Sequence, residues 1–138
     1  MRAFVLDASI TIGWMIDRPV PARASLARRL VISGQTPVVP ALWNHEVSNA
    51  VVMAARRGRL TADQFKTLAD DLEELSDIVE MDPLNVRPTT LIEMARRTNL
   101  TAYDATYLEL ASRRRLPLAT LDDQLREAAR RAGLALIE

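Results

Sequence analysis

Short apolar segments typical of β-strands alternate along this chain with longer segments of helical periodicity, and this alternation constrains the fold most strongly. Each apolar segment ends at an acidic or turn-forming residue or at the end of the chain; the segments are residues 3–7, 36–40, 77–82, 117–122 and 135–138. Strands that alternate with helices predict a parallel sheet covered by helices on both faces. In such folds ligands bind beyond the carboxyl ends of the strands. Functional residues are therefore expected where the apolar segments end.

The segments between the apolar runs are predicted to form helices. Trp43, Val47 and Val51 have the spacing of a buried helix face, and Gly58 suits the C-cap of that helix. Thr61-x-x-Gln64 has the form of a capping box, which opens the next helix. The predicted helices span residues 21–33, 42–57, 61–75, 88–98, 101–115 and 122–132.

The length of 138 residues suits a single domain, residues 1–138, because no repeat, linker or low-complexity stretch divides the chain. The sequence has no cysteine, which excludes a disulfide framework and a thiolate metal site. No apolar run approaches the roughly 20 residues of a membrane-spanning helix, and the apolar N-terminal run is too short for a signal peptide. We therefore expect a cytoplasmic protein with no membrane partner.

The formal net charge is zero, from 18 basic and 18 acidic residues, which at first argues against a nucleic-acid partner. If four of the acids occupied one metal-filled pocket, however, the rest of the surface would have an excess of four positive charges. A basic surface around a metal-neutralised acidic pocket suits an enzyme that acts on phosphodiesters. The alternative is that the arginine clusters are ordinary solvated helix faces.

Asp7 ends the first apolar segment, where an ionised group requires a cleft or a partner to offset its desolvation. The alternative is that Asp7 only caps a helix that begins at Ala8. Glu46 is predicted to lie on the second helix at the border of its apolar stripe, together with Asn49. Surface glutamates normally point away from such a stripe, so this position favours a functional role only slightly.

Asp104 and Asp122 are each explained equally well as helix caps. Thr101-x-x-Asp104 fits a capping box, and Asp122 is a natural N-cap for the last helix. Capping and metal binding are compatible, because a carboxylate has about four lone-pair sites. Asp123 competes with Asp122, but Thr120 and Asp122 alternate along a strand-like path and so face the same way.

The four acids indicate more together than separately. Carboxylates gathered at one sheet edge would repel one another by several kcal/mol without a cation. Mg²⁺ or Mn²⁺, which prefer oxygen ligands, are the expected neutralising ions. A zinc site is poorly supported, because the only histidine, His45, is about 100° around the helix from Glu46.

Four segments resemble the PIN-domain family, and within it the VapC-type toxins of bacterial toxin–antitoxin pairs. They are Val5-Leu6-Asp7-Ala8-Ser9, Glu46-Val47-x-Asn49-Ala50, Leu100-Thr101-Ala102-Tyr103-Asp104-Ala105 and Leu118-Ala119-Thr120-Leu121-Asp122. Each motif is short, but the four occur in the right order over essentially the whole chain. The residue before Leu100, often glycine in this family, is Asn99 here, and the same backbone geometry tolerates it.

The resemblance implies an α/β fold of three layers, with a five-stranded parallel sheet between two layers of helices. It also implies an endoribonuclease dependent on Mg²⁺ or Mn²⁺, a homodimer, and a VapB-like antitoxin; RNA is the substrate, with transfer RNA among the candidates. By position, the acidic tetrad that binds metal and catalyses would be Asp7, Glu46, Asp104 and Asp122. Ser9 and Thr120 would be supporting hydroxyls, and Asn49 would either support the acids or contact the substrate.

Other functions fit the sequence less well. A haloacid-dehalogenase-like phosphatase would need a second aspartate two residues after Asp7, where Ser9 stands. A response-regulator receiver would need a lysine after its last strand, but the only lysine is Lys66 in mid-chain. The alternative that stays open is a catalytically silent PIN-like module that binds RNA or protein.

Overall fold

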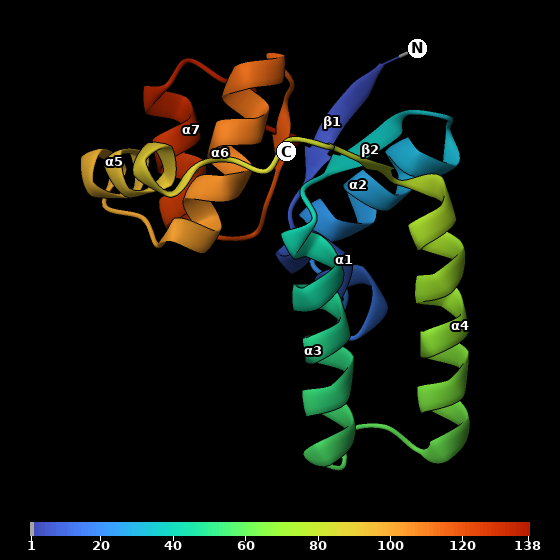
Figure 1. Cartoon of the computed structure of the whole chain (residues 1–138). Coiled ribbons are helices and arrows are strands. Elements are labelled where there is room, and N and C mark those ends of the chain that lie inside the picture. The colour runs from blue at the N-terminus through green and yellow to red at the C-terminus, as the bar shows by residue number, and fades with distance from the viewer. Residues whose placement is uncertain (1) are drawn as a thin grey trace.

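The apolar segments form a parallel sheet in the computed structural model, which describes residues 2–138 (Figure 1). Its order is β3-β2-β1-β4. The register pairs Ala3 with Thr36 and Val5 with Leu118, so the carboxyl ends of β1 and β4 meet at one edge. The strands are β1 (Ala3–Leu6), β2 (Thr36–Val39), β3 (Glu80–Met81) and β4 (Leu118–Ala119).

Alternate residues of β1 face opposite sides of the sheet, and each side is covered by its own helices. Phe4 and Leu6 lie in one apolar cluster with residues of α1, α2, α3 and α4. Val5 lies in a second cluster with residues of α6 and α7, while α5 packs against α6. The helices are α1 (Ala8–Met15), α2 (Ala22–Ile32), α3 (Leu42–Arg56), α4 (Ala62–Ile78), α5 (Pro88–Thr98), α6 (Ala102–Arg114) and α7 (Asp123–Arg131).

The sheet has four strands, so the expectation of five strands is wrong. The predicted fifth strand, residues 135–138, runs parallel to β4 but forms only one bridge, between Leu118 and Leu136. Pro117 has no backbone N–H, and the chain leaves the sheet after Ala119, so β4 is too short to pair further. Two backbone hydrogen bonds to Leu118 therefore hold the C-terminal segment at the edge of the sheet.

The predicted helices all form, with ends shifted by three residues at most. The predicted strand at residues 77–82 is reduced to β3, because α4 continues to Ile78 while its Leu72 and Leu75 pack against the apolar cluster on the sheet. The additional helix α1 has no clear polar face, since Ala8, Ile10 and other residues around it are buried. A helix that is apolar almost all round gives no periodic signal in the sequence.

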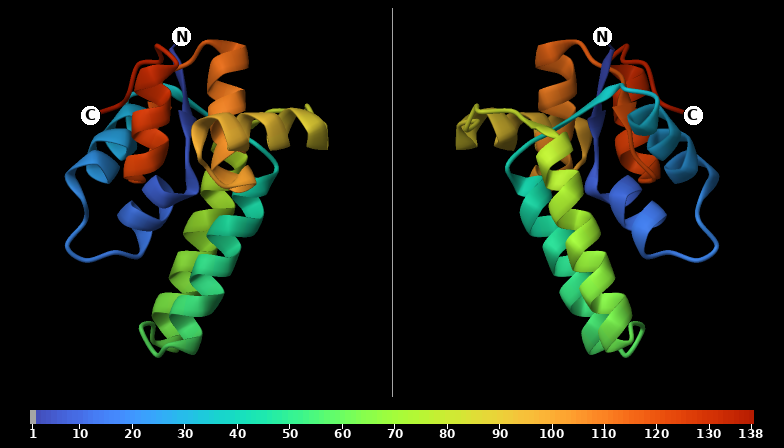
Figure 2. Two further views of the ribbon diagram at one scale, coloured as in Figure 1. Left: turned by 90° about the vertical axis from the view of Figure 1, so that its left-hand side faces the viewer. Right: turned by 90° about the vertical axis from the view of Figure 1, so that its right-hand side faces the viewer.

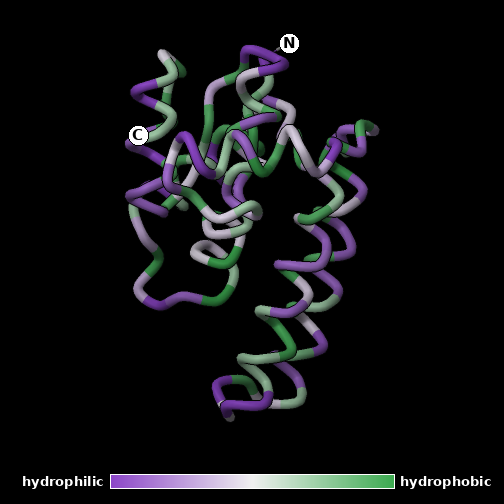
Figure 3. Tube along the Cα trace, turned by 60° about the vertical axis from the view of Figure 1, so that its left-hand side comes forward, coloured by the Kyte–Doolittle hydropathy of each residue, from purple (hydrophilic) through white to green (hydrophobic). Residues whose placement is uncertain are grey.

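The helices α3 and α4 form a hairpin that extends away from the sheet (Figure 2). Gly58 ends α3 with a positive φ of 72°, and the capping box of Thr61 and Gln64 starts α4. The connection between these helices is mostly hydrophilic (Figure 3). Within residues 2–138, no helix is both long and apolar enough to cross a membrane.

Candidate active site

Asp7 follows β1 and stands at the carboxyl edge of the sheet. It occupies the N-cap position of α1, yet its side chain caps none of the described amides of that helix. Instead, Asp7 Oδ2 accepts hydrogen bonds from Ser9 Oγ at 2.5 Å and Thr120 Oγ1 at 2.6 Å. These two hydroxyls fix a carboxylate that is only 5% exposed. The alternative of simple helix capping therefore does not explain where this side chain points.

Thr120 and Ser9 also join the end of β1 to the chain that follows β4. Thr120 Oγ1 accepts a hydrogen bond from the amide of Asp122 at 3.1 Å. Ser9 Oγ accepts one from the amide of Leu121 at 3.0 Å. Because each hydroxyl donates to Asp7 and accepts from this segment, the position of Asp122 relative to Asp7 is set by hydrogen bonds.

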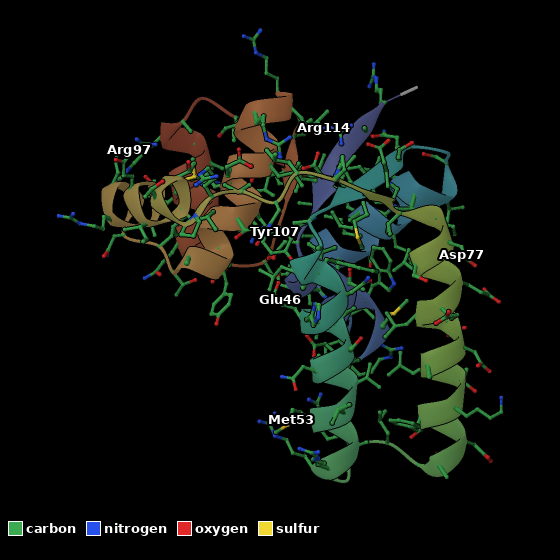
Figure 4. The ribbon with its side chains drawn as sticks, in the orientation of Figure 1. Glu46, Met53, Asp77, Arg97, Tyr107 and Arg114 are labelled. Carbon is green, nitrogen blue, oxygen red and sulfur yellow. The ribbon has the colours of Figure 1, made fainter. Side chains whose placement is uncertain are left out.

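Glu46 reaches the same edge from α3. The buried Trp43, one turn earlier, donates its indole N–H to Thr11 Oγ1 at 3.1 Å, which ties α3 to α1. Glu46 Oε1 accepts a hydrogen bond from the hydroxyl of Tyr107 at 2.6 Å. Figure 4 shows Glu46 and Tyr107 pointing toward each other between α3 and α6. Tyr107 thus fixes the orientation of Glu46.

Tyr107 is a site residue that the sequence analysis did not single out. Its side chain is buried in the cluster beneath α6, and its hydroxyl reaches Glu46 from inside the core. The one available signal is its position three residues after Asp104, which places both on neighbouring parts of one helix face.

Asp104 and Asp122 lie at the starts of α6 and α7. Thr101 Oγ1 accepts a hydrogen bond from the amide of Asp104, but among the described residues the reciprocal bond of a capping box is not formed. Asp122 does cap its helix, because its Oδ1 accepts a hydrogen bond from the amide of Leu125 at 2.8 Å.

Burial and mutual repulsion act on the carboxylates at this edge. Burial raises the pKa of Asp7 above its usual value, and the hydrogen bonds from Ser9 and Thr120 oppose this effect. The negative charges of Asp104 and Asp122 raise the pKa of Asp7 further. Asp7 therefore binds a proton more readily than an exposed aspartate when no cation is present.

The other two perturbed carboxylates behave similarly. Burial raises the pKa of Glu46, the hydrogen bond from Tyr107 lowers it, and the charges of Asp7 and Asp104 raise it. Burial and the negative charge of Asp122 raise the pKa of Asp104, and a hydrogen bond from the hydroxyl of Thr101 lowers it. Of the six possible pairs among these acids, all but Glu46 and Asp122 are close enough to influence each other in this way.

The donor set fits a hard divalent cation by its chemistry, although the geometry is not a closed cage. Across residues 2–138, no group of three or more Asp, Glu or His side chains converges enough to hold a metal ion as it stands. Asp7, Glu46 and Asp122 each engage one carboxylate oxygen in the hydrogen bonds above, which leaves the other oxygen outside them. Mg²⁺ usually keeps several waters and is bound directly by one or two carboxylates. The oxygens outside these hydrogen bonds are donors of the kind that Mg²⁺ prefers.

The comparison with known families agrees with this arrangement. The family model described as PIN domain matches residues 4–131. The chain belongs to the PIN domain family. A relative from Pyrobaculum aerophilum named Ribonuclease VapC3 is 30% identical to this PIN domain over 123 residues, covering 89% of this chain and 92% of the relative. The family resemblance that the four sequence motifs indicated is thereby confirmed.

Two solved structures share the fold of this PIN domain. PAE2754 from Pyrobaculum aerophilum has a TM-score of 0.69 and 22% identity, covering 99% of this chain and 91% of that chain. FitAcB from Neisseria gonorrhoeae has a TM-score of 0.65 and 16% identity, covering 98% of this chain and 96% of that chain. At these identities the likeness shows the fold alone.

Three other polar residues considered from the sequence, His45, Asn49 and Asp123, form none of the described hydrogen bonds at the acidic edge of this PIN domain. Asn49 and His45 are exposed on α3, and no side-chain hydrogen bond to either is present within residues 2–138. Asp123 is exposed and lines a groove between α5, α6 and α7. The hydrogen bonds and charges at the edge involve Asp122 instead of Asp123.

Proposed function

We propose that this PIN domain is an endoribonuclease that depends on Mg²⁺ or Mn²⁺ and acts as the toxin of a toxin–antitoxin pair. The observation that supports this proposal most is the mutual repulsion among Asp7, Glu46, Asp104 and Asp122 at one sheet edge. Such a cluster is unfavourable until a cation neutralises it. The name of the relative Ribonuclease VapC3 supports RNA as the substrate.

In this proposal the side chains have distinct tasks. Asp7, fixed by the hydroxyls of Ser9 and Thr120, would be the rigid ligand of the site. Glu46, oriented by Tyr107, would keep its second oxygen available to orient the attacking water. A divalent ion held here would supply Lewis-acid chemistry, which lowers the pKa of that water and offsets charge on the phosphate.

We further propose that the protein acts in the cytoplasm, as a homodimer, with a VapB-like antitoxin as its inhibitor. The resemblance to VapC toxins supports the antitoxin and the dimer. Exposed apolar side chains also support the dimer: Leu84 and Tyr103, 53% and 64% exposed, line one surface hollow. Asn49 is exposed one turn after Glu46, a position that suits contact with RNA better than support of the acids.

One observation favours a second candidate, a catalytically silent PIN-like module that binds RNA or protein. Among residues 2–138 there is no ready-made group of three metal ligands. A silent module would keep the fold and the acids without assembling a metal ion. Metal-dependent cleavage by the purified protein separates the two candidates.

The first prediction concerns that cleavage. Protein freed of any inhibitor should cut single-stranded RNA with Mg²⁺ or Mn²⁺ and stop when a chelator is added. Asp7→Asn and Asp104→Asn should each reduce the rate by about a hundredfold or more, because each removes a ligand charge. Asp63→Asn, an exposed acid in the first turn of α4, is the matched control and should cut normally.

Thermal unfolding tests metal binding separately from RNA cleavage. Millimolar Mn²⁺ should raise the melting temperature of the wild type by several degrees, because an ion that binds only the folded state stabilises it. Asp7→Asn should show a much smaller rise. RNA cleavage that persists in both aspartate variants would place the active site elsewhere. A melting temperature that Mn²⁺ does not change would count against metal binding by the four acids.

A further inference from the structure

A groove between α5, α6 and α7 begins beside the acidic edge and is not used by the proposed chemistry. Its volume is about 530 Å³, within the range of small-ligand sites. Met94 of α5, Leu108 of α6 and Ala128 of α7 form its apolar part. The groove is therefore large enough, and apolar enough, to hold a planar group the size of a nucleobase.

Two helices that carry acids of the site, α6 and α7, also line the groove. Asp104, Leu108 and Ser112 are spaced by four residues and lie along one face of α6, so the groove starts about one turn, roughly 6 Å, from Asp104. On α7, the groove residue Asp123 directly follows Asp122. A nucleotide next to the bond cut at the acidic edge would thus have the groove within reach.

The charges around the groove favour a base over a phosphate. Arg97 and Arg131 are matched by Asp123 and Glu127, so the lining has no net charge. Arg131 pairs with Glu127 at 3.2 Å, whereas the side chains of Arg97 and Asp123 form no ion pair among residues 2–138. Figure 4 shows Arg97 on α5, at the end of the molecule far from the hairpin. A phosphate in the groove would be attracted by Arg97 and repelled by Asp123, so the lining does not favour its binding.

The polar groups at the rim can recognise the edge of a base. Asn99 and Gln124 present side-chain amides, which have donors and acceptors. The carboxylate of Asp123 only accepts hydrogen bonds and therefore suits an exocyclic amino group, such as N4 of cytosine. Uracil presents a carbonyl oxygen at the same position, which the carboxylate would repel.

We propose that this groove seats one unpaired base of the RNA substrate, next to the cleaved bond, and selects a base with an exocyclic amino group. The proposal rests on the proposed ribonuclease function, whose substrate preference it explains. RNA-binding proteins commonly recognise splayed-out bases on apolar surfaces with polar groups at the base edge.

Cytidine and uridine 5′-monophosphate are the matched probes, because they share the sugar, the phosphate and the pyrimidine ring and differ only in the group on C4 and in the proton on N3. Titration into ¹⁵N-labelled protein should shift the side-chain amide signals of Asn99 and Gln124. Cytidine monophosphate should bind about tenfold more tightly than uridine monophosphate, as expected for one hydrogen bond left unpaired. Equal affinities, or equal shifts with ribose 5-phosphate alone, would overturn the proposal.

Substitutions in the groove test whether the nucleotides bind there. Asp123→Asn replaces a carboxylate, which only accepts hydrogen bonds, by an amide of the same shape that can also donate them. This variant should lose the preference for cytidine monophosphate over uridine monophosphate. Arg97→Ala should weaken both nucleotides, while Arg96→Ala, on the same helix but outside the groove lining, is the matched control. A cytidine preference that survives Asp123→Asn would contradict the assignment.

Cleavage mapping on single-stranded RNA distinguishes failure of this inference from failure of the proposed function. Cuts beside amino-bearing bases in wild type, with the bias lost in Asp123→Asn, support the inference. Metal-dependent cutting without any such bias would overturn the groove assignment and leave the ribonuclease function standing. Selective cytidine monophosphate binding without any RNA cleavage would overturn the ribonuclease function and show that the groove is a nucleotide site.

Discussion

At the residue scale, the hydroxyl of Tyr107 decides which oxygen of Glu46 is available to a ligand. Tyr107 is fully buried, so its position is set by the core beneath α6 and not by the site. Its hydroxyl donates to Glu46 Oε1, 61 residues away in the chain. A side chain fixed by core packing therefore orients an acid on another helix, which makes Tyr107 a positioning residue.

Tyr107→Phe should change the titration of Glu46. The hydrogen bond from Tyr107 lowers the pKa of Glu46, so its loss should raise that pKa further above the usual value. The acidic limb of the rate profile should move to higher pH, and the rate should fall about tenfold. Carboxyl NMR titration of the metal-free protein provides the direct measurement.

The control for this substitution is Tyr103→Phe, which removes an exposed hydroxyl one residue before Asp104. It should leave the titration of Glu46 unchanged. If Tyr107→Phe also leaves that titration unchanged, the hydrogen bond has no role in positioning Glu46.

At the scale of elements, α6 is held against the sheet by ion pairs at its C-terminal half. Arg113 contacts Asp82, which follows β3, at 2.6 Å and Glu109 at 3.0 Å. Asp82 is also held by its amide, which donates to Val39 O at 2.8 Å. Since α6 contributes Asp104 near its other end, this cluster fixes the helix that places that acid.

Asp82→Asn should destabilise the fold by roughly 1–2 kcal/mol at neutral pH, a value reduced because Arg113 is partly exposed. The hydrogen bond from Arg113 lowers the pKa of Asp82 below its usual value of 3.8 in the folded state. The stabilisation is therefore complete above that value and is lost as the pH falls through the lowered pKa.

Urea unfolding of both proteins from pH 7 to pH 3 measures this difference. The difference in the free energy of unfolding between wild type and Asp82→Asn should become smaller below about pH 4. Glu80→Gln, which removes the charge of the half-exposed partner of Arg114, should lower the free energy of unfolding much less than Asp82→Asn does. A gap that stays constant over the whole pH range would show that packing, and not charge, explains the effect of Asp82.

At the scale of the whole molecule, large exposed apolar side chains gather near the start of α6 and the segment before α5. Leu84 and Tyr103 line a shared hollow of about 270 Å³, and Ile92 is exposed on α5. Exposed apolar patches commonly mark interfaces. Because Tyr103 directly precedes Asp104, a dimer formed through this surface would place the acidic edge beside the interface.

The purified protein should therefore be a dimer by light scattering, and Leu84→Glu combined with Tyr103→Glu should shift it toward monomer. Two buried charges in an apolar contact oppose association strongly. Ile32→Glu, at a site 68% exposed on α2, is the matched control and should leave the dimer intact. A double variant that stays dimeric would show that the copies meet elsewhere.

Much of the fold was predictable because its signals are local. The helix periods, the capping box of Thr61 and the positive φ at Asn99 depend on residues a few positions apart. That residues 135–138 would form only one bridge instead of the expected fifth strand was not predictable, because their pairing depends on how much of β4 stays in the sheet. The helix α1 was missed because it is buried on nearly all sides.

For the candidate site, the sequence by itself determined which acids follow strands or begin helices: Asp7, Asp104 and Asp122. Local backbone geometry places such residues at one edge of a parallel sheet. Only the tertiary structure decided that Thr120 reaches Asp7 across 113 residues and that Tyr107 reaches Glu46. Those contacts depend on how helices pack on the sheet, which no short stretch of sequence specifies.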